Sequence, residues 1–208
     1  MSQRKLILAF LGRFVLVFGL LAIPWPGWPE AYAGFVRRSA KTLYRHFGAK
    51  GVVLFQPSLS GDRTLDTEIL LGNRAKLDAS QRGDAARLPF NTRFVAYFPS
   101  ALALALVLAT GVSWRRRVWA SLWALVFMHL FIACLIGLML VSMVNAHPEL
   151  ELFELAPFWR RVVTSLYDIF LTYLGARFAV AVLVWILVTF RRGDYGRLLG
   201  TDGNAGPI

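Results

Sequence analysis

The chain has 208 residues, of which 57% are hydrophobic, and its mean hydropathy is +0.54. A soluble domain of this size is usually about half apolar and has no long uncharged runs, so the composition indicates an integral membrane protein. The formal net charge of +11 does not indicate nucleic-acid binding, because the basic residues flank apolar segments, where solvent or lipid headgroups account for them.

Four segments are predicted to be transmembrane helices, each of which needs about 20 predominantly apolar residues. They are residues 6–23, 94–112, 118–144 and 165–190. The third is longer than a bilayer requires, so this helix must tilt or protrude. We therefore expect an all-α integral membrane protein with four transmembrane helices and a small external segment.

The basic residues beside these spans predict their orientation, since cytoplasmic flanks are rich in Lys and Arg. The basic clusters are Arg4 and Lys5 before the first span, Arg115–Arg117 between the second and third, and Arg191, Arg192 and Arg197 after the fourth. With four spans all three clusters fall on one side. Both termini are then cytoplasmic, residues 24–93 and 145–164 are external, and the polar tail 193–208 is expected to be disordered.

The N-terminal span has an alternative interpretation as a secretory signal peptide. A basic start, an apolar run and the small residues Ala31 and Ala33 in "AYA" are typical of such a segment, with cleavage after Ala33. The apolar run is long for this role and is interrupted by Arg13. An uncleaved membrane anchor is the preferred interpretation.

The external segment is predicted to hold an amphipathic helix (31–48), a β-hairpin (51–72) and a polar loop (73–89). The helix has an apolar face that would lie on the outer membrane surface or pack on the following strands. Its basic residues are expected at the membrane surface: Arg37, Arg38, Lys41 and Arg45.

Charged side chains within the spans are the main candidates for a binding site, because each is costly in a bilayer unless it is satisfied. Arg177 and His129 are expected at a similar depth on adjoining spans, as a polar site between helices or as structural contacts. Asp168 lies near the outer interface, where it could meet Arg93 at the start of the second span. Solvation at the membrane surface is the alternative for Asp168.

Catalytic and metal-binding motifs are not evident, and no cofactor or metal is expected. Cys134 is the single cysteine and stands in an apolar run, where a thiol is usually a packing residue. His129 is five residues earlier, so the two side chains do not share a helical face.

The segment "FNTRFVAYFPSALALALVLATGVSWRRRVWASLWALVFMH" (90–129) resembles the bacterial membrane proteins that accompany exosortases, in particular the exosortase H-associated type. The shared features are the overall plan and a short turn of the pattern A-T-x-x-S-W-R-R-R. The resemblance implies a non-enzymatic accessory or scaffold of the bacterial inner membrane, in a system that sorts exported proteins. Its implied partners are membrane lipids and another integral membrane protein such as an exosortase.

The alternative function is that of an exosortase-class cysteine transpeptidase or protease, which would use Cys134, His129 and Arg93 or Arg177. Exosortases carry their cysteine in an A-C-S-G-like stretch, whereas Cys134 stands in "IACLIG" without the Ser-Gly. "NTR" (91–93) also departs from the spacing of that family's Asn-x-x-Arg element. These departures favour the accessory function.

Overall fold

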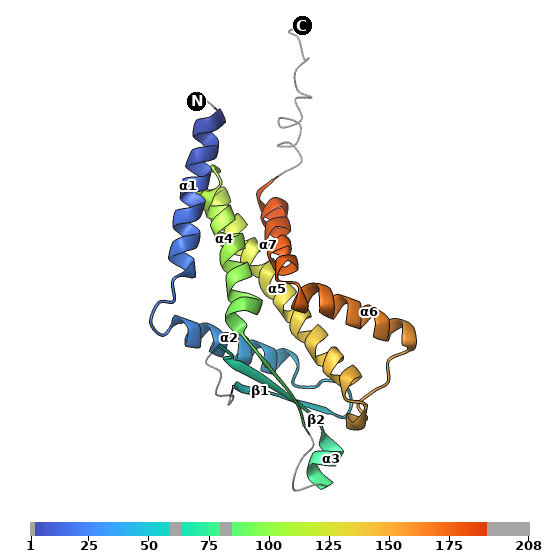
Figure 1. Cartoon of the computed structure of the whole chain (residues 1–208). Helices are drawn as coiled ribbons and strands as arrows, with labels where there is room; N and C mark the ends of the chain where they lie inside the picture. Colours follow the sequence, from blue (N-terminus) through green and yellow to red (C-terminus); the bar gives the residue numbers. More distant parts are fainter. Residues whose placement is uncertain (1–2, 59–63, 80–84, 191–208) are drawn as a thin grey trace.

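The computed structural model describes residues 3–58, 64–79 and 85–190. The described chain is mostly helical and contains one small antiparallel sheet (Figure 1). The tail predicted to be disordered, residues 193–208, lies outside the described residues.

Four apolar helices run side by side in the upper half of the molecule (Figure 1). They are α1 (Gln3–Ala22), α4 (Phe98–Ala109), α5 (Trp114–Ala146) and α7 (Leu174–Thr189). Arg116 at the start of α5 donates to the carbonyl of Thr189 at the end of α7, and Trp185 donates to the hydroxyl of Thr110 after α4. The α4–α5 turn and the end of α7 therefore lie together, at the end of the bundle where α1 begins.

The sheet lies below these helices and contains three strands in the order β1 (Gly51–Pro57), β2 (Thr67–Asn73) and β3 (Ala86–Phe90). The register pairs Val53 with Leu71 and Ile69 with Leu88, so alternate residues of the strands point to one apolar face. That face is buried against α5 and against α2 (Trp28–Leu43).

Helix α5 connects the two halves, because it contributes to both hydrophobic clusters of the described chain. Its first half packs with α4 and α7 through Ala120, Ala124 and Met128. Its second half packs with the sheet and α2, through residues such as Leu135 and Leu140. The apolar helices and the sheet are thus built on one common element.

The predicted hairpin is present, but the polar loop predicted for 73–89 was wrong in part. This region forms helix α3 (Arg74–Ala79) and strand β3. Within β3, Ala86, Leu88 and Phe90 point to the core side of the sheet, and Pro89 is tolerated because β3 is an edge strand. The many polar residues before this strand obscured its short alternation.

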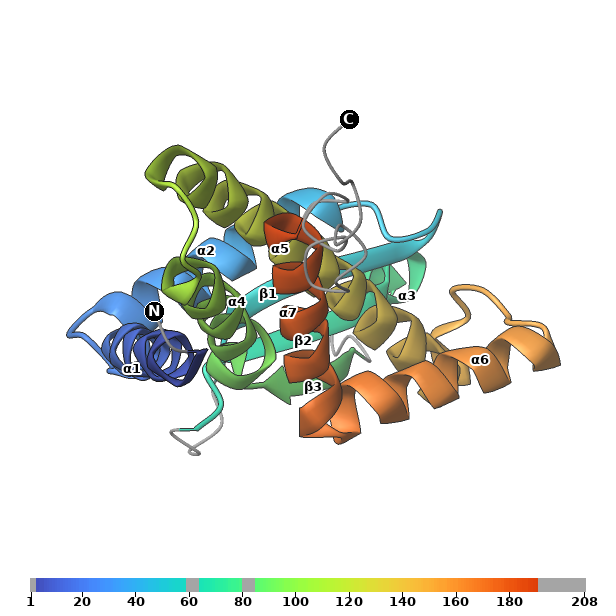
Figure 2. The same ribbon diagram turned by 90° about the horizontal axis from the view of Figure 1, so that it is seen from above.

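The predicted fourth span, 165–190, was wrong as a single straight helix. Its first part belongs to α6 (Pro157–Tyr167), which continues as a π-helical turn (Asp168–Thr172). Tyr173 then has extended backbone (φ −87°, ψ 107°) and separates this turn from α7. The two helices meet at 85°, and α6 projects away from the bundle (Figures 1 and 2).

By length and composition, one helix of the described residues, α5, qualifies clearly as a membrane span. The bent α6–α7 pair is a second if it is counted as one span, while Ile7–Ala22 and Arg93–Ala109 are shorter apolar helices. Four spans of full length are therefore not shown by this criterion.

The predicted amphipathic helix (31–48) corresponds to α2, which begins earlier and ends earlier, at Leu43; it packs against the sheet and α5, with Val36 and Ala40 buried in the core. Just after α2, the hydroxyl of Tyr44 donates to the carbonyl of Ala133 in α5. The ring lies directly over Gly137, where a Cβ atom would come within 2.8 Å of the Tyr44 oxygen. Gly137 thus permits the close approach of this segment to α5.

Replacing Gly137 with Ala is predicted to displace Tyr44 and lower the free energy of unfolding by about 1–2 kcal/mol, through overpacking and loss of one hydrogen bond. Thermal unfolding in detergent measures this change. The matched control is Gly19→Ala in α1, where a Cβ meets no atom within 4 Å, so this variant should be at least as stable as the parent. Equal losses in the two variants would contradict the prediction.

Candidate partner-binding interface

A polar network joins the sheet to the start of the α4 segment. The carboxylate of Asp66 accepts hydrogen bonds from the backbone amide (3.0 Å) and hydroxyl (2.6 Å) of Thr92. The hydroxyls of Thr67 and Thr92, both fully buried, are 2.9 Å apart. Arg37 of α2 donates to the carbonyl of Asp66 (3.0 Å) and to the Thr67 hydroxyl (3.3 Å). This network fixes α2, β2 and residues 91–93 relative to one another.

Arg93 begins a π-helical turn (Arg93–Tyr97) that leads into α4. Its guanidinium donates to the carbonyl of Ala22 at the end of α1 (2.9 Å) and lies 4.8 Å from the centre of the Phe98 ring, a cation–π contact. The hydroxyl of Tyr97 donates to the carbonyl of Leu21. Both side chains therefore cap the C-terminal carbonyls of α1.

Arg177 is 5% exposed and contacts this same turn. In the turn, the Phe98 amide donates to the carbonyl of Arg93, five residues earlier. The next donor in this pattern would be Pro99, which has no N–H, so the carbonyl of Phe94 has no helical donor. The Arg177 guanidinium donates to it at 3.4 Å. Two of the predicted site residues therefore meet at one π-helical turn: Arg93 begins the turn, and Arg177 donates to its Phe94 carbonyl.

A cleft of about 440 Å³ opens beside this network. Its lining residues come from α2, the end of β1 and the segment before α4: Pro29, Glu30, Ala33, Arg37, Pro57, Thr64, Asp66, Asn91, Arg93 and Phe94. A guanidinium carries five N–H donors, and the contacts above use only part of those on Arg37 and Arg93. The cleft therefore suits a segment that brings carboxylate or carbonyl acceptors.

His129 lies away from Arg177, and the expected polar layer of the two is not formed among the described contacts. Its Nδ1 is 2.7 Å from the carbonyl of Leu125, one turn earlier on α5, which identifies this nitrogen as the protonated one. The ring makes edge contacts with Phe35 (5.5 Å between centres) and Tyr32 (6.3 Å) of α2. In this structure His129 packs against α2.

Cys134 is exposed and lies near Tyr44. Since the protonated Nδ1 of His129 is held by its own helix, the described residues do not pair the thiol with an activating base, which a nucleophilic cysteine requires. Because the thiol is exposed, Cys134 is not part of the hydrophobic core of the described residues, and a packing role there is not seen.

Asp168 is exposed and lies in the π-helical turn after α6. Arg93 has Ala22 and Phe98 as partners, so the predicted contact between Asp168 and Arg93 is not among the described interactions. Solvation, the alternative interpretation, fits the exposure of Asp168.

The four basic residues predicted at a membrane surface separate into two groups. Arg37 is partly buried and takes part in the polar network, a role that the prediction did not include. Arg38, Lys41 and Arg45 are exposed, as a surface role requires.

The sequence reasoning missed the roles of Asp66, Thr67 and Thr92. In the sequence these residues lie in a predicted turn and at predicted strand ends. The pairing of β2 with β3 brings Asp66 and Thr67 close to Thr92. The sequence reasoning also did not predict that Pro99, which has no N–H, would leave the Phe94 carbonyl without a helical donor and available to Arg177. The position of the proline in the sequence could have indicated this.

Tyr32 of α2 lies beside the π-helical turn, with its ring 5.2 Å from that of Tyr97 between centres. Burial raises the pKa of Tyr32 from 10.0 to about 12, and nearby Tyr97 acts in the same direction, while Ser100 acts against it. The neutral phenol is therefore the form that the folded chain favours.

Loss of the Asp66 carboxylate is predicted to destabilise the fold. Asp66→Ala leaves the buried Thr92 amide and hydroxyl without their acceptor and should cost about 2 kcal/mol. Chemical denaturation in detergent measures this, with Asp168→Ala as control, since an exposed carboxylate should change stability by less than about 0.5 kcal/mol. Indistinguishable midpoints for the two variants would refute this role of Asp66.

The raised pKa of Tyr32 predicts a distinct alkaline transition. Its contribution to stability should be fully present below pH 10 and be lost as the pH rises through about 12. Ultraviolet titration of the parent minus that of Tyr32→Phe isolates this phenol. A difference transition centred near pH 10 would show that Tyr32 is not buried as described.

Comparisons with known protein families, curated proteins and solved structures find no match to this chain.

Proposed function

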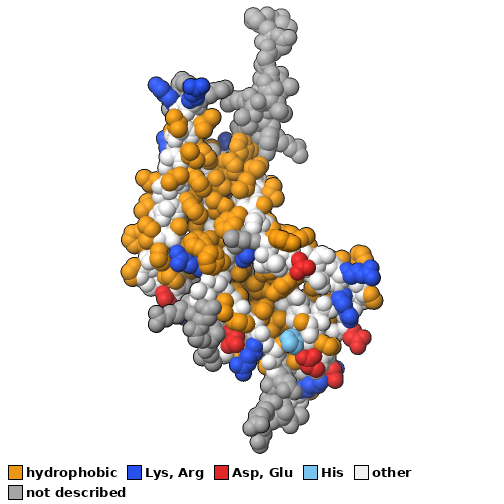
Figure 3. All heavy atoms as spheres, in the orientation of Figure 1, with side chains coloured by type: hydrophobic (Ala, Val, Ile, Leu, Met, Phe, Trp, Pro, Cys, Tyr) orange, Lys and Arg blue, Asp and Glu red, His pale blue; other side chains and the backbone are white. Residues whose placement is uncertain are grey.

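We propose that the chain is a non-enzymatic accessory protein of the bacterial inner membrane that holds a partner membrane protein at its external cleft. The observation that carries the proposal is the division of the surface into an apolar upper half and a more polar lower half (Figure 3). A contiguous apolar surface of this extent marks a membrane or protein contact.

The apolar half is formed by exposed side chains of α1, α5 and α7. These side chains are Ile7, Leu8, Leu11, Val15, Leu16 and Leu20 of α1, Trp114, Val118, Trp119, Leu122, Trp123, Val126 and Leu130 of α5, and Val182, Leu183 and Leu187 of α7. In water their exposure would be unfavourable, by roughly 25 cal/mol for each Å² of apolar surface. If α1, α4, the first half of α5 and α7 each cross the bilayer, lipid instead of water covers these apolar side chains.

The lengths of these helices fit a bilayer with some adjustment. At 1.5 Å per residue α1 extends about 30 Å, and α7 and the Arg93–Ala109 helix about 25 Å each, against a hydrocarbon thickness of about 30 Å. Small mismatches are taken up by local thinning of the bilayer. Both termini and the Arg115–Arg117 turn are then cytoplasmic, and α2, the sheet and the cleft are external.

Helix α6 fits this placement as an interfacial helix. Its Phe158, Trp159 and Leu166 are exposed, while Arg160 and Arg161 lie on its other side. Such a helix lies in the plane of the interface with its apolar side toward the acyl chains, and the 85° bend to α7 produces this orientation.

The resemblance to exosortase-associated membrane proteins suggests an exosortase-type enzyme as the partner. The cleft beside Asp66 and Arg93 is the surface proposed to contact it, because it combines unused guanidinium donors with a rigid hydrogen-bonded frame. The separation of Cys134 from an activating base favours this accessory function over a cysteine transpeptidase.

A photo-crosslinking experiment tests the proposal. A benzophenone amino acid replaces Glu30, an exposed residue of the cleft, in chain co-produced with an exosortase-type enzyme of the same bacterium. The control position is Glu151, an exposed carboxylate whose partner is Lys76, away from the cleft. We expect crosslinks to the enzyme from position 30 and at least tenfold fewer from position 151.

Equal yields at the two positions, or none at position 30, would contradict the proposed surface. Cys134→Ala separates the two function classes: processing of exported substrates should be unchanged for an accessory and abolished for a cysteine enzyme.

A further inference from the structure

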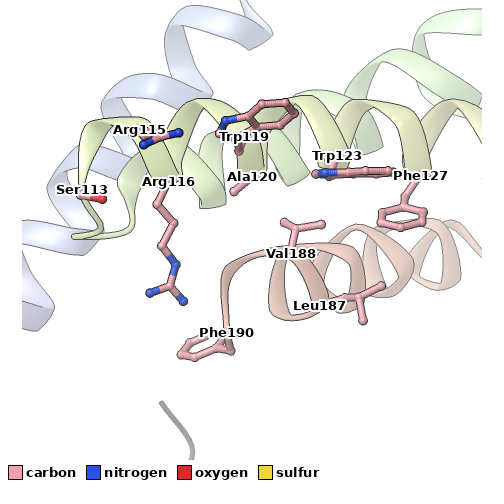
Figure 4. Close-up of a pocket in the computed structure, with 10 residues that line it drawn as sticks. All are labelled: Ser113, Arg115, Arg116, Trp119, Ala120, Trp123, Phe127, Leu187, Val188 and Phe190. Carbon is pink, nitrogen blue, oxygen red and sulfur yellow. The ribbon is translucent and has the colours of Figure 1, made fainter. Parts of the chain in front are cut away.

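A groove of about 890 Å³ lies between the start of α5 and the end of α7 (Figure 4). It is distant from the external cleft. Trp119, Trp123 and Phe127 of α5 line one side, and Leu187, Val188 and Phe190 line the other. The volume lies within the range of small-molecule sites, roughly 300–1,000 Å³.

The polar residues of the groove gather at one end. Ser113 and Arg115 are exposed there, and Arg116 extends from α5 toward Phe190 (Figure 4). Arg116 donates to the carbonyl of Thr189 at 2.6 Å, which holds its guanidinium at the mouth of the groove. Among the described residues, the charged side chains that line the groove, Arg115 and Arg116, are both cationic.

Arg117, the third member of the triplet, has a different role. Its guanidinium donates to the carbonyls of Thr110 (3.1 Å) and Val112 (3.4 Å) and lies over the Trp114 ring. It closes the α4–α5 turn and does not line the groove. The triplet therefore contains one structural arginine and two that face a cavity.

We propose that this groove binds one anionic phospholipid of the cytoplasmic leaflet, with its phosphate at Arg115 and Arg116 and an acyl chain along the tryptophans. This rests on the proposed membrane placement, in which the groove opens to lipid on the cytoplasmic side. Basic pockets between helices on that side bind anionic headgroups, arginine matches phosphate geometry, and tryptophan favours the headgroup level.

The order of chemistry along the groove favours a lipid over a helix of another protein. Cationic groups at one end, two indole rings next, and Leu187 with Phe127 beyond them follow the phosphate, glycerol and acyl parts of a phospholipid (Figure 4).

Native mass spectrometry tests the proposal on the full chain in mixed micelles of phosphatidylglycerol and phosphatidylcholine with identical acyl chains. We expect one retained phosphatidylglycerol in preference to phosphatidylcholine. Arg115→Gln alone should reduce this preference about fivefold, and adding Arg116→Gln up to about 25-fold. The matched control is Arg160→Gln with Arg161→Gln, an exposed arginine pair on α6 without a groove.

Two further variants separate charge, shape and folding. Arg116→Lys keeps the charge and should retain most of the preference, whereas Val188→Trp fills the groove while keeping both arginines and should lose the bound lipid. Thermal unfolding identifies a variant that has lost the fold.

Equal retention of the two lipids by the parent, or an equal loss in the Arg160/Arg161 control, would overturn the proposal. So would efficient disulfide linkage of two copies through Trp119→Cys in a Cys134→Ala background, which would make the groove a contact between copies. If the chain stays in solution without detergent, the membrane placement itself fails. If it requires the membrane but takes both lipids equally, the lipid site alone fails.

Discussion

The structure depends on the packing of one face of α5 against two different sets of partners along its length. Its 33 residues extend about 50 Å, well beyond the hydrocarbon thickness of about 30 Å. Its first half packs small residues, such as Ala120 and Ala124, against α4 and α7. Its second half supplies larger residues, such as Leu135 and Leu140, to the sheet and α2. Helix α5 thus supports both the apolar helices and the layer formed by the sheet and α2.

Between these halves, side chains from distant parts of the chain donate hydrogen bonds to backbone carbonyls. The carbonyls at the end of α1 accept from Arg93 and Tyr97, and the Phe94 carbonyl, which Pro99 leaves without a helical donor, accepts from Arg177. An unsatisfied carbonyl in an apolar environment is costly. The buried Arg177 therefore has a structural role, as the donor to the Phe94 carbonyl. Arg93, in the same turn as Phe94, lines the cleft.

The sequence predicted the apolar segments, the long third helix and the hairpin, because hydrophobic length and alternation are local signals. The basic clusters also led us to expect the α4–α5 turn and the end of α7 on the same side of the bundle. The hydrogen bond from Arg116 to the carbonyl of Thr189 joins these two places. The sequence did not reveal the bend at Tyr173, since an apolar run looks the same in a straight and in a broken helix. Strand β3 and the role of Asp66 depend on long-range pairing, and His129 faces α2 because of how α5 is rotated, which spacing alone does not define.

Accessibility of nitroxide labels along α5 in lipid nanodiscs tests the membrane placement most directly, with single cysteines introduced in a Cys134→Ala background. If the first half of α5 lies in the bilayer, labels at Val118, Leu122, Val126 and Leu130 will collide with dissolved oxygen and be shielded from a water-soluble nickel chelate. A label at Ala146, which is exposed at the end of the helix, will show the reverse. Free access of the chelate to all five positions would mean that water surrounds the apolar half, and the account would be wrong.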